Sequence, residues 1–322
     1  MKHTKIRSYN KRGGRGHYIL PLLLFFCLFP LVMSGFQTIE KQSIVIENSP
    51  GQVWVLEKHF WGEKWIEMEE YLVGMLAATI PQDYEKETLK AQAIILRSFC
   101  MTQMKKENGK KVIHDDIIQD YYLGEKQREV LWQDAYGEYE AKMKEIISET
   151  RGILLVCDGD IMNPPFFRLS NGATRDVGEY ILQKEKYPYM KSVDCKGDML
   201  ADNYIQYVEM TQKEFEKRLK KLLPGDEQKI QKLVSYKDEK GYVKEVEING
   251  VRMEGERFRQ AFDLASSSFT LQKINSIIEI QTKGIGHGFG FSQWSANALA
   301  KEGLTYEELL HHFYKNITLE KI

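Results

Sequence analysis

A break between two helical patterns constrains the fold of this chain more than any other feature. Residues 69–100 read EEYLVGMLAATIPQDYEKETLKAQAIILRSFC, and apolar residues recur there at three- and four-residue steps. They are Tyr71, Leu72, Met75, Leu76 and Ala78 in the first half and Leu89, Ala93, Leu96 and Cys100 in the second. This spacing predicts two helices. Pro81 biases Ile80 away from helical geometry, so the first helix should end there. The result is a short polar elbow on a buried support, which suits an active site and equally suits an ordinary core helix pair.

The N-terminus predicts a membrane anchor. Residues 1–17 contain six Lys or Arg and no acid, and Tyr18–Phe36 is a run of 19 residues without a charge. At about 1.5 Å per residue, this run nearly spans a hydrocarbon core of about 30 Å. The basic tail should stay in the cytoplasm and residues after Phe36 should lie outside the cell membrane. A cleavable signal peptide is the alternative, since Val32 and Ser34 satisfy a small-residue processing site, but the run is long and contains Pro30.

The charge of the exported part argues against a nucleic-acid partner. Six of the 45 Lys and Arg precede the apolar run, which leaves 39 against 46 Asp and Glu, a net charge of about −7. A nucleic-acid-binding domain would show a basic footprint instead. This balance neither requires nor excludes a neutral glycan.

The cysteines and histidines predict no metal site and no cofactor. Cys27 lies in the apolar run, whereas Cys100 and Cys157 fall in predicted core positions. A disulfide among Cys100, Cys157 and Cys195 stays open, because no spacing demands it. No CxxC or HxxC spacing typical of structural zinc occurs. His114, beside two aspartates, is more typical of a solvated loop than of a metal or acid–base site.

The rest of the chain mixes strands and helices without strict alternation, which predicts an α+β fold. Residues 105–124 look irregular, and residues 125–150 look like one helix. The expected organisation is a tail at 1–17, a transmembrane helix at 18–36, a linker and first strand at 37–52 and a globular domain at 53–322. Other expected elements are strands at 53–57, 153–157 and 276–281, hairpins at Asp158-Gly159 and 233–248, and helices at 211–224, at 254–262 and after Thr305.

Three segments carry a resemblance to a known family. The first contains Glu69-Glu70-Tyr71-Leu72, Gly74, Pro81, Leu89-Lys90-Ala91-Gln92-Ala93 and Arg97; the second runs from Gly255 to Phe269; the third is Gly286-His287-Gly288-Phe289-Gly290-Phe291-Ser292-Gln293-Trp294. In this order they resemble the stage II sporulation protein D family, to which the amidase enhancers also belong. The resemblance covers roughly residues 45–320. It implies a domain with a cleft for peptidoglycan glycan strands stripped of stem peptides.

The resemblance also implies partners, a location and site residues. The partners would be an amidase and a membrane scaffold of the engulfment machinery that surrounds the forespore, and the site residues would line the glycan cleft. Each site residue also has a structural alternative, because serine, asparagine and histidine side chains in tight turns often only orient the turn. The implied cleft residues are Gln92, Arg97, Ser170, Asn171, Thr174, His287, Ser292 and Gln293.

One departure from the family pattern bears directly on activity. The family has alanine, alanine, glutamate, methionine and proline at the elbow, and its glutamate is the acid of the lytic transglycosylases. This chain has Thr79 in that position. An alcohol cannot protonate a leaving group at neutral pH, and general acid help typically contributes about 10²–10⁴-fold. Asp83 is the nearest substitute, although acids at helix N-termini are mostly caps.

Three hypotheses follow. The chain is a lytic transglycosylase that uses another carboxylate, or a non-catalytic glycan-binding or amidase-activating module. The third is an amidase enhancer of a vegetative cell wall.

Arg168 stands where the family has a histidine, which further argues against zinc in this chain.

Overall fold

The structure is a computed structural model that describes residues 52–59, 62–107, 110–179, 185, 187–222 and 232–322. The basic tail, the predicted transmembrane segment and the linker before residue 52 lie outside the described residues. Within the described ranges, no helix has the length and apolar character needed to cross a membrane. The anchor, the alternative signal peptide and the membrane location therefore stay predictions.

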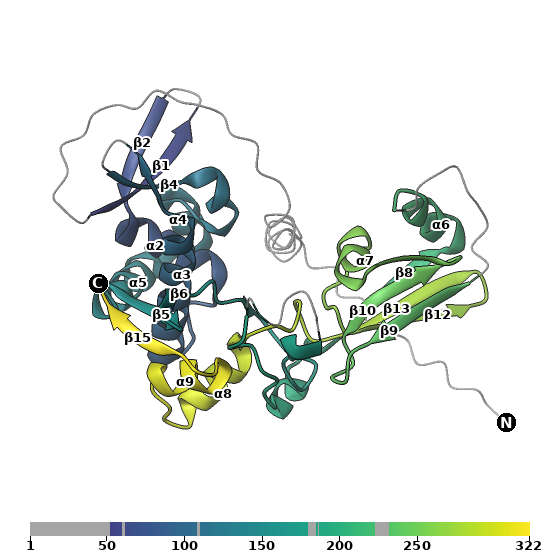
Figure 1. The fold of residues 1–322 in the computed structure, drawn as a ribbon. Coiled ribbons are helices and arrows are strands. Elements are labelled where there is room, and N and C mark those ends of the chain that lie inside the picture. The colour runs from purple at the N-terminus through teal and green to yellow at the C-terminus, as the bar shows by residue number, and fades with distance from the viewer. Residues whose placement is uncertain (1–51, 60–61, 108–109, 180–184, 186, 223–231) are drawn as a thin grey trace.

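The chain forms two bodies joined by a narrow middle region (Figure 1). Each body has its own cluster of buried apolar side chains. The first body contains residues 53–162 and then residues 293–321, whereas the second contains residues 205–283. The chain therefore leaves the first body, builds the second and returns.

The first body is built around one buried helix, α3 (Lys86–Gln103). Helices α2, α5, α8 and α9 contact it, as does strand β5. Its other helices are α2 (Met68–Thr79), α4 (Glu125–Trp132), α5 (Tyr136–Glu149), α8 (Gln293–Lys301) and α9 (Tyr306–Phe313). One sheet has the order β2-β1-β4-β3, with β1 (Val53–His59), β2 (Gly62–Glu67), β3 (Lys105–Glu107) and β4 (Lys110–His114). The other has the order β15-β5-β6, with β5 (Ile153–Cys157), β6 (Asp160–Ile161) and β15 (Thr318–Lys321).

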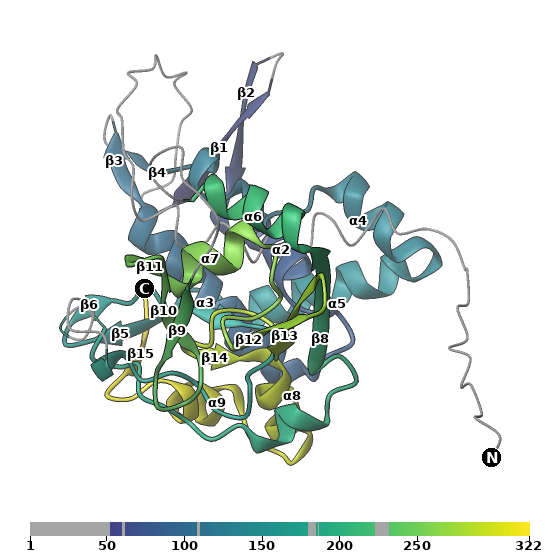
Figure 2. The same ribbon diagram turned by 90° about the vertical axis from the view of Figure 1, so that its right-hand side faces the viewer.

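The second body consists of two antiparallel sheets and two helices. The first sheet has the order β12-β13-β8, with β8 (Ile205–Thr211), β12 (Phe269–Ile274) and β13 (Ile277–Lys283). The second has the order β11-β10-β9, with β9 (Leu233–Lys237), β10 (Val243–Ile248) and β11 (Val251–Glu254). Helices α6 (Gln212–Lys220) and α7 (Gly255–Ala261) lie on the same side of these strands in both ribbon views (Figure 2). Phe258, Phe262 and Phe269 stack in the core between them.

The middle region brings two distant segments side by side. Strand β7 (Phe166–Phe167) pairs in parallel with β14 (Phe291–Ser292). Leu169 forms a bridge with Ile285, and Ser266 forms one with Gly286. The glycine-rich closing segment, residues 284–292, therefore runs along the segment that leaves the first body.

The sequence predicted the local elements well and two longer stretches poorly. The helix–elbow–helix unit, the β5–β6 and β9–β10 hairpins and the Thr305 cap are confirmed. The irregular structure expected at 105–124 was wrong, because Val112 and Ile113 are buried and β4 pairs in parallel with β1. The single helix expected at 125–150 was also wrong, because Gln133 adopts a φ of 48° and separates α4 from α5.

Candidate functional site

The elbow between α2 and α3 is held on both sides by distant helices. Ile80 is extended after the last helical residue, Thr79. Lys142 of α5 donates from its Nζ atom to the carbonyls of Gln82 and Tyr84, both at 2.9 Å. From α8, the side-chain oxygen of Asn297 accepts a hydrogen bond of 2.8 Å from the backbone of Glu85. The elbow is thus a supported turn of defined shape.

The closing segment reaches this elbow through one side chain. Gln293 is buried at the start of α8, and its Nε2 atom donates to the carbonyl of Thr79 at 2.8 Å. The same atom lies 3.2 Å from Oε1 of Gln92 on α3. Three predicted residues therefore meet although Thr79 and Gln293 are 214 positions apart. We call the surroundings of this contact the elbow site, with the members Thr79, Asp83, Tyr84, Gln92, Arg168 and Gln293.

The position of the family acid holds no titratable group. Thr79 is 5% exposed, and its hydroxyl donates to the carbonyl of Leu76 in its own helix at 3.4 Å. Asp83 is exposed in the turn that follows. Within the described residues, its carboxylate forms no hydrogen bond or ion pair. Its role as a substitute acid stays a prediction.

Two members of the elbow site were not predicted as site residues. Arg168 follows β7, and its carbonyl accepts from the backbone of Trp294 at 3.1 Å. The register that pairs Phe167 with Ser292 places Arg168 beside Gln293. Burial raises the pKa of Tyr84, and the positive charge of Arg168 partly opposes this rise. Arg168 therefore lies close enough to the elbow to act on the Tyr84 phenol. The departure of residue 168 from the family histidine was the only signal in the sequence.

A buried carboxylate behind the elbow was missed altogether. Asp198 accepts at 2.6 Å from the backbone of Ser170 and at 2.8 Å from the hydroxyl of Ser292, and Ser295 donates to its other oxygen. Burial raises the pKa of Asp198, and the bonds from Ser295, Ser170 and Ser292 oppose the rise. The side chain is completely buried. Asp198 thus fixes the β7 segment against β14 and α8, and it cannot reach a ligand in this conformation.

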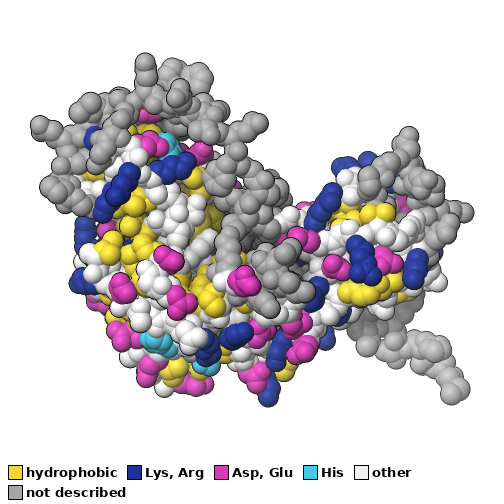
Figure 3. Space-filling model, viewed as in Figure 1, with side chains coloured by type: hydrophobic (Ala, Val, Ile, Leu, Met, Phe, Trp, Pro, Cys, Tyr) yellow, Lys and Arg dark blue, Asp and Glu magenta, His cyan; other side chains and the backbone are white. Residues whose placement is uncertain are grey.

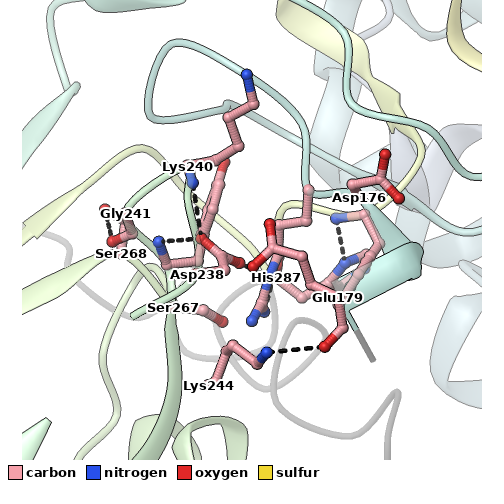
Figure 4. Close-up of polar contacts among 12 residues, drawn as sticks. Asp176, Glu179, Asp238, Lys240, Gly241, Lys244, Ser267, Ser268 and His287 are labelled. Atoms are coloured by element: carbon pink, nitrogen blue, oxygen red, sulfur yellow. Dashed lines mark hydrogen bonds and ion pairs between the residues drawn. The ribbon is translucent and has the colours of Figure 1, made fainter. Parts of the chain in front are cut away.

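His287 lies in a polar network between the closing segment and the second body (Figure 4). It is 8% exposed, and its Nδ1 atom accepts from the backbone of Phe289 at 3.0 Å. Its own carbonyl accepts from Arg175, whose guanidinium pairs with buried Asp238 at 2.8 Å. The next residue, Gly288, has a φ of 85°, and a Cβ atom there would lie 2.5 Å from the Tyr242 ring. These contacts orient the loop, which was the structural alternative for His287. A glycan contact for this ring stays a prediction.

His287 should make stability depend on pH. Burial lowers its pKa from 6.5 to about 4, although the neighbouring Glu256 carboxylate favours the charged form. Because the pKa of His287 is lower in the folded than in the unfolded protein, neutral His287 contributes its full stabilisation above about pH 6.5. This stabilisation is lost as the pH falls toward about 4. We expect wild type to lose about 2 kcal/mol of unfolding free energy through this group between pH 7 and pH 5.

Urea unfolding of the full-length protein at several pH values tests this expectation. The His287→Gln variant should be less stable at pH 7 and should lose less stability on acidification than wild type does. The His311→Gln variant changes an exposed histidine of α9 and should keep the wild-type slope. Parallel slopes for wild type and His287→Gln would contradict a neutral, buried His287.

The other predicted cleft residues make internal hydrogen bonds. Arg97 is 0% exposed and forms two bonds of 2.8 Å with Glu69 in the core of the first body. The side chain of Asn171 donates to the carbonyl of Lys240 and to the hydroxyl of Ser268. The Ser170 hydroxyl accepts from the backbone of Gly172, and the Thr174 hydroxyl accepts from the backbone of Val193. The Ser292 hydroxyl donates to Asp198. In the described part of the chain, side-chain hydrogen bonds join Thr79, Gln92 and Gln293, while Ser170 and Ser292 meet through Asp198. Glycan binding by the other predicted residues stays untested.

The described residues contain no group of three or more His, Cys, Asp or Glu placed to hold a metal ion. Cys100, Cys157 and Cys195 are buried free thiols. Burial raises the pKa of Cys100 to about 12, so it is an inert core residue at neutral pH.

Comparisons with known proteins show similarity to stage II sporulation proteins. The profile described as stage II sporulation protein matches residues 58–157. Stage II sporulation protein D of Bacillus amyloliquefaciens is 27% identical over 281 residues, covering 86% of this chain and 80% of that protein. Its counterpart in Bacillus subtilis (strain 168) is 29% identical over 262 residues, covering 80% and 75%. An uncharacterized protein of Brachyspira hyodysenteriae is 24% identical over 261 residues, covering 79% and 67%.

Proposed function

We propose that this chain, which carries a domain of the stage II sporulation protein family, binds peptidoglycan glycan strands at the elbow site without cleaving them. The observation that carries the proposal is the contact of Gln293 with the carbonyl of Thr79. It joins the two segments of strongest family resemblance at one supported turn, while the position of the family acid holds a buried threonine. The elbow site therefore keeps the contact between the two segments but has no carboxyl group at residue 79 to donate a proton.

Cleavage of a glycosidic bond requires a proton donor. The leaving oxygen must be protonated as the oxocarbenium-like state develops. A lytic transglycosylase needs only that acid, because the sugar's own 6-hydroxyl serves as nucleophile. A suitable acid has a raised pKa and touches the substrate. Asp198 has the raised pKa, but it is completely buried and accepts three hydrogen bonds. Its geometry suits a support for the binding site.

The face of the protein seen in Figure 3 does not show the continuous basic surface that a polyanion would require. On the face seen in Figure 3, acidic and basic side chains are interspersed over both bodies. A nucleic-acid partner would require a continuous basic surface. The half-buried phenol of Tyr84 and the exposed carboxylate of Asp83 are a donor and an acceptor of the kind that sugar hydroxyls use.

A second candidate function is a lytic transglycosylase in which Asp83 is the acid. It is favoured by one observation: Asp83 is an exposed carboxylate on the elbow itself, and its charge acts on the Tyr84 phenol. In either case the proposal places the protein outside the cytoplasm, anchored to the cell membrane by residues 18–36. An engulfment amidase and a membrane scaffold are its proposed partners, and a vegetative amidase enhancer is the remaining alternative.

The two candidates differ in what Asp83→Asn does. Full-length protein in detergent micelles is mixed with amidase-treated peptidoglycan, and pelleting measures binding while mass spectrometry measures 1,6-anhydromuramyl products. We expect wild type and Asp83→Asn to bind within about twofold of each other and to release no product above background, since Asp83 is exposed to water whereas a general acid lies in a partly apolar pocket. Product release by wild type that Asp83→Asn abolishes would instead establish the transglycosylase.

A further inference from the structure

We propose that Arg168 is a specificity-determining residue of the elbow site that binds a free carboxylate on the glycan. This inference rests on the proposed function, because it assigns a charge preference to the same site. On a peptidoglycan strand, the carboxylate is the lactyl group of muramic acid, which is charged only where no stem peptide is attached. Arg168 would therefore select peptide-free strands.

The position of Arg168 is fixed by its backbone. It directly follows β7, where Phe166 and Phe167 are buried, and its carbonyl accepts from the backbone of Trp294 at 3.1 Å. This bond holds Arg168 beside the first turn of α8, whose Gln293 reaches Thr79. The electrostatic effect of Arg168 on Tyr84 agrees with this position.

The guanidinium of Arg168 is available for a ligand. The side chain is half-buried, and it forms no hydrogen bond or ion pair with any described residue. By contrast, the arginines with buried guanidinium groups all have carboxylate partners in the described part of the chain: Arg97 with Glu69, Arg128 with Glu140, Arg175 with Asp238 and Arg259 with Glu256. An arginine fork matches a carboxylate in a bidentate manner, with stronger bonds than neutral groups form.

The other charged groups near the elbow are either engaged by neighbouring groups or negative, so Arg168 is the cation that can bind a ligand carboxylate. Lys142 is engaged by two elbow carbonyls, and the Asp198 carboxylate is saturated by three donors. Asp83 is exposed and acts on the same phenol with the opposite sign. A ligand carboxylate beside Arg168 would thus meet one unpaired cation, with the Tyr84 hydroxyl as a further donor.

The test compares binding of one protein to three glycans. They are peptide-free glycan strands, the same strands with their carboxyl groups converted to methylamides, and chitin oligosaccharides, which lack the lactyl group. We expect full-length wild type to bind the free strands about 10- to 100-fold more tightly than the amidated strands, as expected for a charge-assisted bidentate contact. Arg168→Gln should bind both forms equally, at the wild-type affinity for the amidated strands. Arg168→Lys should recover part of the preference, and Arg252→Gln, which removes an exposed charge from the second body, should keep all of it.

The outcomes separate the two proposals. Binding of free and amidated strands with equal affinity by wild type, unaffected by Arg168→Gln, would overturn the role of Arg168 and leave the proposed function standing. Absence of binding to all three glycans would overturn the proposed function and this inference with it. Tighter binding of chitin oligosaccharides than of free strands would also overturn the inference.

Discussion

Replacing Thr79 with glutamate is expected to raise the release of 1,6-anhydromuramyl products from amidase-treated peptidoglycan by about 10²- to 10⁴-fold over wild type. The reason lies in the surroundings of residue 79, which is 5% exposed at the end of α2. A carboxyl group there would be partly desolvated, which raises its pKa toward the range of a general acid. The carbonyl of Thr79 is already fixed by Gln293, so the substitution should restore the proton donor without moving the backbone.

The control for this gain is Thr79→Gln, which has the size of glutamate and no acidic proton. It should bind glycan strands as Thr79→Glu does and release no product. Equal product release from both variants, or from wild type, would show that turnover does not depend on an acid at residue 79. Thr79→Glu with no activity despite retained binding would show that another part of the catalytic arrangement is also missing.

The ends of several helices were predictable because residues close to them in the sequence determine where they begin and end. Pro81 stops α2, and Thr305 caps α9 through Glu308, three positions away. The strand β4 was missed because its buried Val112 and Ile113 pair with β1, more than fifty residues earlier. No spacing within residues 105–124 reveals such a pairing. The break at Gln133 was missed for a related reason, since a positive φ at a non-glycine residue leaves no signature in helical periodicity.

The candidate site was predictable only in part. Thr79, Gln92 and Gln293 came from the resemblance and meet at the elbow. Asp198 was missed because its donors lie 28, 94 and 97 positions away. A lone aspartate in a polar segment gives no hint that the fold will bury it. The resemblance implied Arg97 and Ser170 as ligand contacts, and in the structure both make internal hydrogen bonds, so a glycan contact for either stays a prediction. Polar residues that stabilise a fold and those that bind a ligand look alike until their partners are known.

Replacing Arg97 with methionine is expected to lower the free energy of unfolding by about 3–5 kcal/mol. Arg97 makes two bonds of 2.8 Å to Glu69 and also donates to the carbonyl of Ile147 and the hydroxyl of Thr150. These contacts connect α3 to α2 and to the end of α5. Methionine fills a similar volume, so the loss should come from a buried Glu69 charge that has lost its partner.

Urea unfolding of the full-length protein at pH 7, followed by circular dichroism, measures this loss. Lys86→Met is the matched control on the same helix, because Lys86 and Glu145 form an ion pair that is 53% and 47% exposed. It should change stability by less than about 0.5 kcal/mol. The double variant Arg97→Met with Glu69→Leu should recover most of the loss, since it removes the stranded charge as well. A loss below about 1 kcal/mol for Arg97→Met would mean that water reaches Glu69 and satisfies it. In that case the junction of α2, α3 and α5, which positions Thr79 and Gln92, would depend on apolar packing alone.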